Sequence, residues 1–575
     1  NKEEIEKLIK KLSAYLNDDY IAYYAAKGYQ ALERYEDAAH IWEKLCEKFP
    51  MHYGAGIGML EYYIHKGQYK RANEHALDLL RKYVNDEAIY VLLVKANEYL
   101  IAEYEEECRK DPDNLEIKEE LAWCYYLNAR IDECILLLNE IPGGEKEKSW
   151  YLKICGYVYL KKGELPKALE HLFKWLDLIQ ASKEGESWKK DFCRCNQLIG
   201  ISYIGEENYE QSIAYLKNSI SIEENTGEKL STMERLAYAF LKLGRNEDCI
   251  DVCDDIVRQS ERYYPAYIHR QEAFFNMKNG KGVIDDYYKA VEAYAGFAKP
   301  YLIAAKVFYL YEQYEDSIGV VKRAKEAGVS SNELEFLYGK NLRLAAQNAE
   351  ESKAALKVFS DLYKNMSEKS KAIDEDKEKN GKNEDEFNDL GDILNETAKV
   401  YADMGQFEKA LDTIKEAIDI NPKDDYYTTK AYLYMDLELY EHAIEILKKQ
   451  VKVFPESEYI HVCLASCYYK KGRDEDALEL YKKTLDINPD NVEALEKVGD
   501  SYINLYKCKG SIEYYETAIR YGERLLELKS DSYCYVHVGI MYEKGYEFEK
   551  SLNCYEKASE LNPDDMWPHN NAGYV

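Results

Sequence analysis

The sequence predicts an all-α repeat protein, a right-handed superhelical solenoid of antiparallel helix pairs. Small residues recur every 33 or 34 positions, and a proline follows each of them twelve residues later. A second small residue lies twelve positions ahead of each one. The three sets are Ala398, Ala431 and Ala465, then Ala410, Ala443 and Ala477, then Pro422, Pro455 and Pro489. A repeat of this length with two small residues indicates two helices joined by a tight turn.

The twelve-residue spacing has a mechanical reason. It places the two small residues on facing helices, so that the backbones can approach to the short end of helix packing distances. An aromatic residue three positions after the first small residue, as at Tyr401, fills the space beside them. Each pair then exposes an apolar face that only the next pair can cover, so the pairs must stack in an array.

The same register extends over most of the chain. Repeats are predicted to begin near Asp19, Tyr53, Leu115, Ser149, Cys193, Leu230, Tyr264, Ala298, Gly391, Asp424, Ser457, Val492 and Ser532. The small residues of the other second helices are Ala38, Ala72, Cys134, Ala168, Ser212, Cys249, Ser317 and Ser551, where serine and cysteine replace alanine by size. Gly54, Gly56 and Gly58 lack the context of a phosphate-binding loop, so close helix packing explains them better.

Several segments depart from the register. We expect one extended helix near 86–113, an insertion in the turn near 332–366, and an overlong second helix at 507–530. Residues 367–390 are highly charged and are predicted to be a flexible insertion or hinge. The predicted organisation is an N-terminal helix at 1–18, a first array at 19–366, the insertion at 367–390, a second array at 391–565, and the start of a further, truncated repeat at 566–575.

Composition limits the classes of partner. The formal net charge is −30, which opposes attraction to nucleic acid or to an anionic membrane and favours protein or peptide partners. No stretch of 18 apolar residues occurs, and the first residues do not resemble a secretion signal. The 14 cysteines are scattered through predicted helices without a disulfide framework, so a reducing cytoplasm is expected.

No pattern in the sequence predicts catalysis or a cofactor. There is no Cys-x-x-Cys pair, no His-Glu-x-x-His and no Gly-x-Ser-x-Gly elbow. Cys463 and Cys467 share a helix face from which His461 points away, so no metal site is expected there. We therefore expect a protein that is not an enzyme, with no cofactor and no metal.

The small–aromatic–small–proline order and the Asp-Ile-Asn-Pro helix ends at 419–422 and 486–489 resemble the tetratricopeptide repeat family. The resemblance implies that first helices line a concave groove that selects a peptide or helix of a partner. Placed on this chain, it implies that one set of aromatic side chains lies in the groove. These are Tyr20, Tyr23, Trp123, Tyr126, Tyr157, Tyr238, Phe275, Tyr309, Tyr432, Tyr459, Tyr469 and Tyr533.

Tyrosine is abundant, with 56 residues against 14 phenylalanines. Its rigid ring and hydroxyl suit recognition, although many tyrosines of the repeat also serve packing, and the two roles stay open. Lys27, Arg194 and Lys306 are candidates to pair with a ligand carboxylate. Asn395 and Lys399 have the residue types of the carboxylate clamp found in related co-chaperones, but in reversed order, and the following repeats do not complete it.

A second resemblance covers 264–273 and 299–302, which look like the repeat arms of some bacterial J-domain proteins. It implies an Hsp70-type chaperone partner, although the chain contains no His-Pro-Asp motif. The sequence thus leaves three functions open. They are a non-catalytic protein-interaction scaffold, a client-binding arm of a J-domain co-chaperone, and the regulatory module of an enzyme or sensor whose active domain lies elsewhere.

Overall fold

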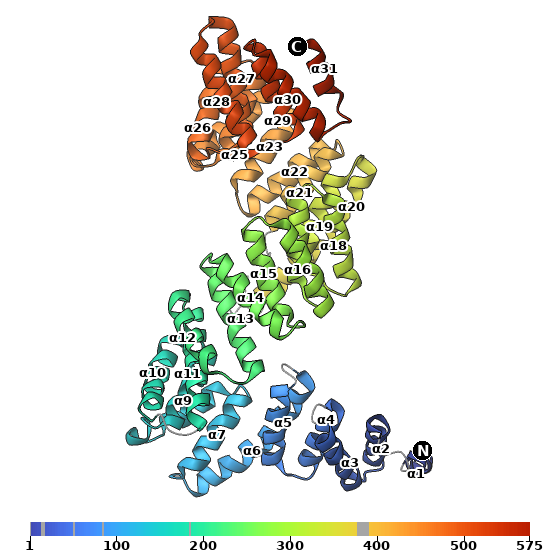
Figure 1. The fold of residues 1–575 in the computed structure, drawn as a ribbon, viewed down its shortest axis with the longest axis vertical. Coiled ribbons are helices and arrows are strands. Elements are labelled where there is room, and N and C mark those ends of the chain that lie inside the picture. Colours follow the sequence, from blue (N-terminus) through green and yellow to red (C-terminus); the bar gives the residue numbers. More distant parts are fainter. Residues whose placement is uncertain (1, 13–17, 50–51, 83–85, 183–185, 376–389) are drawn as a thin grey trace. The chain divides into compact units, whose positions relative to one another are not determined.

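The structure, a computed structural model, describes the chain except for residues 1, 13–17, 50–51, 83–85, 183–185 and 376–389. The described residues form α-helices, with one short 3-10 helix at Gly143–Glu145 and no β-strand. The predicted all-α class is therefore confirmed. Contacts divide the chain into two compact units, Asn1–Tyr294 and Ala295–Val575, which are described separately below (Figure 1).

Unit 1 begins with a single helix and continues as pairs, interrupted by one long helix, α6. Its helices are α1 (Lys2–Leu12), α2 (Asp19–Ala31), α3 (Tyr35–Lys48), α4 (Tyr53–His65), α5 (Tyr69–Lys82), α6 (Glu87–Lys110), α7 (Leu115–Leu127), α8 (Ile131–Asn139), α9 (Ser149–Lys162), α10 (Leu165–Ala181), α11 (Glu186–Gly205), α12 (Tyr209–Ile222), α13 (Thr226–Lys242), α14 (Asn246–Gln259), α15 (Tyr264–Asn276) and α16 (Gly280–Ala293).

The described part of unit 2 contains seven helix pairs and a last single helix. Its helices are α17 (Ala298–Leu310), α18 (Tyr314–Glu326), α19 (Asn332–Ala345), α20 (Ala349–Glu375), α21 (Leu390–Asp403), α22 (Phe407–Ile420), α23 (Asp424–Asp436), α24 (Tyr440–Val453), α25 (Glu458–Lys470), α26 (Asp474–Ile487), α27 (Val492–Lys509), α28 (Ile512–Leu528), α29 (Ser532–Lys544), α30 (Phe548–Leu561) and α31 (Met566–Tyr574).

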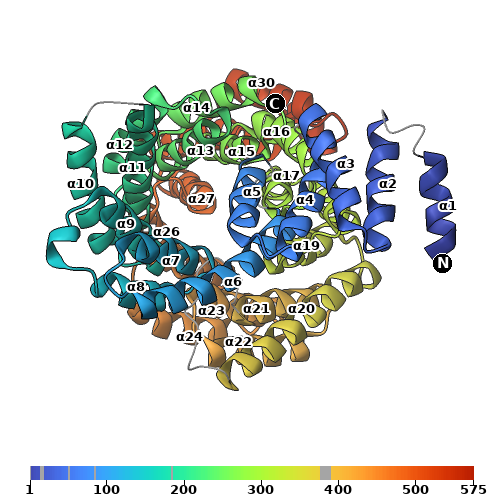
Figure 2. The same ribbon diagram turned by 90° about the horizontal axis from the view of Figure 1, so that it is seen from below.

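The helices of a pair pack on each other, and the first helices of neighbouring pairs also meet. In unit 1, α7 contacts α9, α9 contacts α11, and α11 contacts α13. Figure 2 shows α7, α9, α11 and α13 on the inner side of α8, α10, α12 and α14. The same contacts between first helices recur in unit 2, for example between α27 and α29. We call the side lined by the first helices of a unit its first-helix face.

The small residues lie where the helices of a pair approach most closely. Gly156 and Gly539 are good examples, because a Cβ atom built on them would lie 2.4 Å from Leu172 and 2.6 Å from Tyr555. The second-helix positions predicted to be small are at most 1% exposed in every repeat. Gly54, Gly56 and Gly58 have the same role, since an added Cβ atom would meet Tyr23, Leu79 and Trp42 at 2.4 to 2.6 Å.

Serine and cysteine at the second-helix position are small enough for close packing, and their side chains also donate hydrogen bonds. Four of these five residues donate a hydrogen bond to the backbone carbonyl of the small residue twelve positions earlier, whereas Cys249 donates to the carbonyl of His269 at 3.8 Å. The bonds are Cys134 Sγ to Ala122 at 3.3 Å, Ser212 Oγ to Gly200 at 2.9 Å, Ser317 Oγ to Ala305 at 2.9 Å, and Ser551 Oγ to Gly539 at 2.8 Å. The sequence predicted these substitutions from size alone.

The irregular segments confirm the extended helix near 86–113 and the overlong second helix at 507–530, and they correct the expected insertion near 332–366. The extended helix near 86–113 is α6, with 24 residues. The turn between α19 and α20 has no insertion, because only 346–348 separate the two helices and the extra length lies in the 27-residue α20. At 507–530 both helices are lengthened, since α27 has 18 residues and α28 has 17.

The predicted insertion at 367–390 is partly helical. Residues 367–375 continue α20, because a run of lysine, glutamate and alanine extends a helix that is already nucleated. Helix α20 also packs on α21, so pairing continues across this segment inside unit 2, and the units divide at 294/295 instead. The remainder of the predicted insertion, 376–389, lies outside the described residues.

The cysteines are free thiols, and most of them are buried in the helices. Cys463 and Cys467 are both 0% exposed, which suits the predicted role of small apolar residues. Among the described helices, none combines the length and the apolar character that crossing a lipid bilayer requires.

Candidate functional site

Three aromatic side chains meet on the first-helix face of unit 1. Trp123 and Tyr126 come from α7, and Tyr157 comes from α9. Their ring centroids lie 5.4 to 5.9 Å apart, and each pair of rings meets edge to face, which is a favourable geometry. All three rings are only partly buried. We call Trp123, Tyr126 and Tyr157 the aromatic cluster.

The guanidinium group of Arg194, on α11, borders the aromatic cluster. Its Nε donates to the hydroxyl of Tyr157, and its centre lies 5.6 Å from the Tyr157 ring. Its Nη1 donates to Oε1 of Gln197 at 2.6 Å, and Gln197 in turn donates to Thr232 at 2.9 Å. These partners are neutral, and no carboxylate of the described residues lies within ion-pair distance of Arg194.

A second cation, Lys161, also borders the cluster. The ammonium group of Lys161 lies 4.8 Å from the centre of the Tyr126 ring and donates to the Tyr126 carbonyl at 3.3 Å. Burial lowers the pKa of Lys161 and raises that of the Tyr126 hydroxyl to about 12. The cluster is therefore a partly desolvated aromatic surface flanked by two positively charged side chains.

The other predicted residues of unit 1 lie apart from this cluster. Tyr20 is 68% exposed and meets Tyr24 edge to face at 4.8 Å. Tyr23 packs beside His52, and Tyr238 packs beside His269. Phe275 is partly buried.

Lys27, a candidate carboxylate ligand, already has an internal partner. Its ammonium group lies 3.6 Å from the carboxylate of Glu61 and donates to Gln30 at 3.1 Å. The positive charge of Lys399, another candidate, is also neutralised within the protein, because its ammonium group donates to Glu396 at 2.8 Å. These two lysines are therefore weaker candidates than Arg194.

Asn395 does not present its amide to a partner. It is 2% exposed and donates to Asp425 at 3.1 Å. The sequence placed Asn395 in the correct helix but could not show that its amide donates to a carboxylate 30 residues later. This hydrogen bond joins α21 to α23.

Lys306 and Tyr309 lie on α17, and the structure adds a residue that the sequence analysis missed. Lys340, on α19, lies 4.8 Å from the centre of the Tyr309 ring. Lys340 follows Lys306 by 34 residues, so the repeat length alone could have identified it. The remaining predicted tyrosines, Tyr432, Tyr459 and Tyr533, are exposed by 42%, 60% and 59%, whereas Tyr469 is partly buried beneath Lys497.

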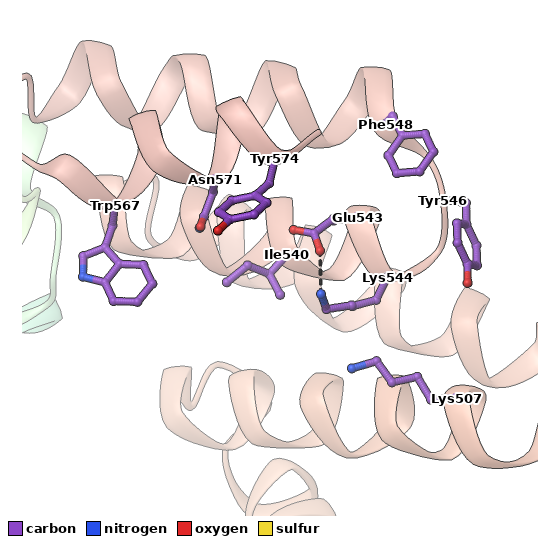
Figure 3. A pocket seen from close by; sticks show the side chains of 9 residues that line it. All are labelled: Lys507, Ile540, Glu543, Lys544, Tyr546, Phe548, Trp567, Asn571 and Tyr574. Atoms are coloured by element: carbon purple, nitrogen blue, oxygen red, sulfur yellow. Dashed lines mark hydrogen bonds and ion pairs between the residues drawn. The ribbon is translucent and has the colours of Figure 1, made fainter.

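Unit 2 also has a pocket that no sequence motif indicated. It has a volume of about 720 Å³ and is lined by residues of α27, α29, α30 and α31 and by Tyr546 of the turn before α30. Figure 3 shows Trp567 and Tyr574 of α31 opposite Lys507 of α27. The rings of Trp567 and Tyr574 are largely exposed, at 69% and 90%, so this pocket is an open hollow on the surface.

Comparison with known sequences supports the repeat assignment. The description "Tetratricopeptide repeat" matches residues 194–226, 392–424 and 425–457, and "TPR repeat" matches 465–505. The TPR repeat-containing protein MJ1428 of Methanocaldococcus jannaschii is 25% identical over 439 residues, covering 71% of this chain and 69% of its own. The transcriptional activator NprA of Geobacillus stearothermophilus is 28% identical over 110 residues, covering 18% of this chain and 27% of its own.

Among solved structures, Naa15/Naa10 bound to HypK-THB aligns over 97% of this chain and 96% of its own, at 12% identity and a TM-score of 0.32. That score is too low to support any argument about function. The matched segments and the observed helix pairs together show that this chain contains tetratricopeptide repeats.

Proposed function

We propose that unit 1 recognises a segment of a protein partner on its first-helix face, at the aromatic cluster and Arg194. In this proposal the rings of Trp123, Tyr126 and Tyr157 contact an apolar or planar group of the partner. The guanidinium group of Arg194 binds a carboxylate of the same segment. The protein acts by binding and is not an enzyme.

One observation carries the proposal, namely a partly buried guanidinium group without an acidic partner. A desolvated charge is costly unless an opposite charge or several hydrogen bonds compensate it. The carboxylate of Glu228 also acts on Arg194, but Glu228 is exposed and forms no ion pair with Arg194 within the described part of the chain. Arg270, by comparison, is held by Asp254 and Asp286. A carboxylate from a partner would supply the negative charge that compensates the guanidinium group of Arg194.

The aromatic cluster supports the same conclusion. Tyrosine and tryptophan offer a large contact area with few rotatable bonds, and both are enriched among residues that dominate binding energy. The cluster residues retain exposed area although they pack against the core of α7 to α12. The surface is therefore rigid before a partner arrives, which lowers the entropic cost of binding.

The proposal can be tested with a peptide library. The full chain is used to select peptides, and the selected peptides are remeasured by fluorescence anisotropy against Arg194→Gln. We expect Arg194→Gln to weaken peptides with a required carboxylate by about tenfold or more, the value of one charged hydrogen bond. Neutralising that carboxylate in the peptide should weaken binding to the wild type but not to Arg194→Gln.

Two controls make the result specific. Arg258→Gln removes the same charge from an exposed position on α14, where Arg258 pairs with Asp255, and should leave affinity unchanged. The triple variant Trp123→Ala, Tyr126→Ala, Tyr157→Ala should lose the peptides while circular dichroism confirms retained helicity. Unchanged affinity in both Arg194→Gln and the triple variant would show that this surface serves only packing.

The resemblance to repeat arms of J-domain proteins, and with it an Hsp70-type partner, stays a prediction. So does the regulatory-module alternative. Both predict a partner for this chain, and the peptide selection would identify its chemistry in either case.

A further inference from the structure

A compact group of metal-ligating side chains lies on the first-helix face of unit 2. Glu496 and Asp500 are one turn apart on α27, and His537 projects from α29. Their ligating atoms all lie within 4.8 Å of one another. The sequence did not reveal this group, because the histidine follows the two acids by about one repeat and acidic residues are abundant throughout the chain.

The spacing of these atoms suits a shared metal ion better than direct hydrogen bonds. Nε2 of His537 lies 3.5 Å from Oε1 of Glu496 and 3.4 Å from Oδ2 of Asp500. A tetrahedral zinc ion with bonds of about 2.0 to 2.1 Å separates its ligands by roughly 3.3 Å. We propose that Glu496, Asp500 and His537 form a site for a divalent transition-metal ion, with zinc as the best-fitting species.

The surroundings support ligation. The side chains of Glu496 and His537 are 9% and 14% exposed, while Asp500, at 31%, leaves a route from solvent. Tyr533 donates its hydroxyl proton to Oε1 of Glu496 at 3.1 Å and so orients that carboxylate. Nδ1 of His537 is buried without a hydrogen-bond partner in the described part of the chain, and Nε2 is the ring nitrogen that lies near the two acids.

Lys497 places a positive charge beside the two carboxylates. Its ammonium group lies 2.6 Å from Oε1 of Glu496 and 4.0 Å from Oδ2 of Asp500. One lysine balances only one of the two carboxylates, whereas a dication balances both. The lysine side chain is long and flexible and can move into solvent when a metal ion enters. Lys497 is thus a competitor of the metal, and removing it should favour metal binding.

This competition separates a metal site from an ordinary network of ion pairs. In an ion-pair network, Lys497→Met leaves two carboxylates unneutralised, and no metal restores the lost stability. In a metal site, Lys497→Met is destabilised without metal but binds the ion more tightly than the wild type does. The two interpretations therefore predict opposite effects of metal on the same variant.

The experiment uses the full chain after treatment with a chelator. Zn²⁺ is titrated by isothermal calorimetry, and Co²⁺ replaces it to report coordination through its visible absorption. We expect one equivalent to bind, His537→Ala and Glu496→Gln to weaken it at least tenfold, and Lys497→Met to strengthen it. His442→Ala is the matched control, because His442 stacks on Tyr434 far along the sequence from the site and should leave binding unchanged.

Three outcomes would overturn the proposal. They are no stoichiometric binding by the wild type, equal affinity in His537→Ala, or weaker binding by Lys497→Met with its helicity intact. Ligation by cysteine instead would give near-ultraviolet thiolate absorption with Co²⁺ and would survive His537→Ala, which also excludes this site.

Discussion

At the scale of single residues, the fold depends on positions where almost no side chain fits. The helical glycines opposite second-helix side chains show this most clearly, since Gly539 leaves no room for a methyl group next to Tyr555. Gly319, on α18, is different, because an added Cβ atom would meet nothing within 4 Å. The same substitution should therefore have opposite effects at the two sites.

We predict that Gly539→Ala destabilises α29 and α30, by about 1 to 3 kcal/mol as expected for overpacking. Gly319→Ala should stabilise α18 by up to about 1 kcal/mol, because alanine is the better helix former. Hydrogen exchange measured by mass spectrometry reports both effects locally. Faster exchange in α18 of Gly319→Ala, or no change around Gly539→Ala, would contradict this account of the small residues.

A buried histidine should make unit 1 sensitive to pH. Burial alone would lower the pKa of His269, but the carboxylates of Glu234 and Glu272, at 3.7 and 3.9 Å, raise it to about 9. Because the folded pKa exceeds the unfolded value, the stabilisation is complete below about pH 6.5 and is lost as the pH rises through about 9.

The expected result is a pH-dependent gap between the wild type and His269→Gln. The melting temperature of the wild type should exceed that of the variant most at pH 6, and the gap should narrow by pH 9.5. Other titrating groups are common to both proteins and cancel in the comparison. A gap that is constant over this range would show that His269 does not carry a folding-linked proton.

At the scale of elements, most of the turns inside the helix pairs contain one residue in the left-handed backbone conformation. A residue with positive φ recurs there, and it is glycine in some repeats, such as Gly163 at φ +80°, and another residue elsewhere, such as Ala129 at φ +57°. A side chain in the left-handed region costs roughly 1 kcal/mol, whereas glycine is free of that cost. The repeats therefore differ in how much strain their turns hold.

We predict that Ala129→Gly stabilises unit 1 by up to about 1 kcal/mol and that Gly163→Ala destabilises it by a similar amount. Gly143→Ala is the control, because Gly143 lies outside these turns, has no positive φ and has open space around its Cβ direction. Denaturant midpoints of the three variants provide the measurement. A loss of stability in Ala129→Gly would refute the strain interpretation.

The sequence predicted the elements well wherever the twelve-residue rule holds. It identified helix pairs by small residues such as Ala410 and Ser551, because only small side chains fit where two helix backbones pack closely. It failed at α20, where the extra residues extend a helix instead of a turn. A sequence rich in charged residues does not distinguish a long exposed helix from a charged loop. The site residues were harder to predict. The partners of Lys27 and Asn395 lie about 30 residues away in the chain, and only the three-dimensional structure shows that they meet.

At the scale of the whole molecule, the charge of −30 is a general source of repulsion. Many surface ion pairs are local, as between Arg524 and Glu527, and each contributes little. Repulsion between like charges acts over the Debye length, which falls from about 30 Å at 0.01 M salt to about 8 Å at 0.15 M. The balance should therefore favour the folded state at higher ionic strength.

We predict that the melting temperature rises when sodium chloride is increased from about 10 to about 150 mM, most steeply at the low end. Differential scanning calorimetry across a salt series measures this directly. Sodium sulfate at equal ionic strength controls for anion effects on the protein surface. A falling melting temperature would mean that attractive ion pairs outweigh the net repulsion.

Contacts that run mainly from each helix to its nearest neighbours also have an evolutionary consequence. Duplicating or losing one helix pair disturbs only the junctions on either side of it. A lineage can therefore lengthen or shorten such a chain in steps of about 34 residues while a distant surface, such as that around Arg194, is inherited intact. Proteins that descend from one ancestor can thus differ widely in length and still share the same surface.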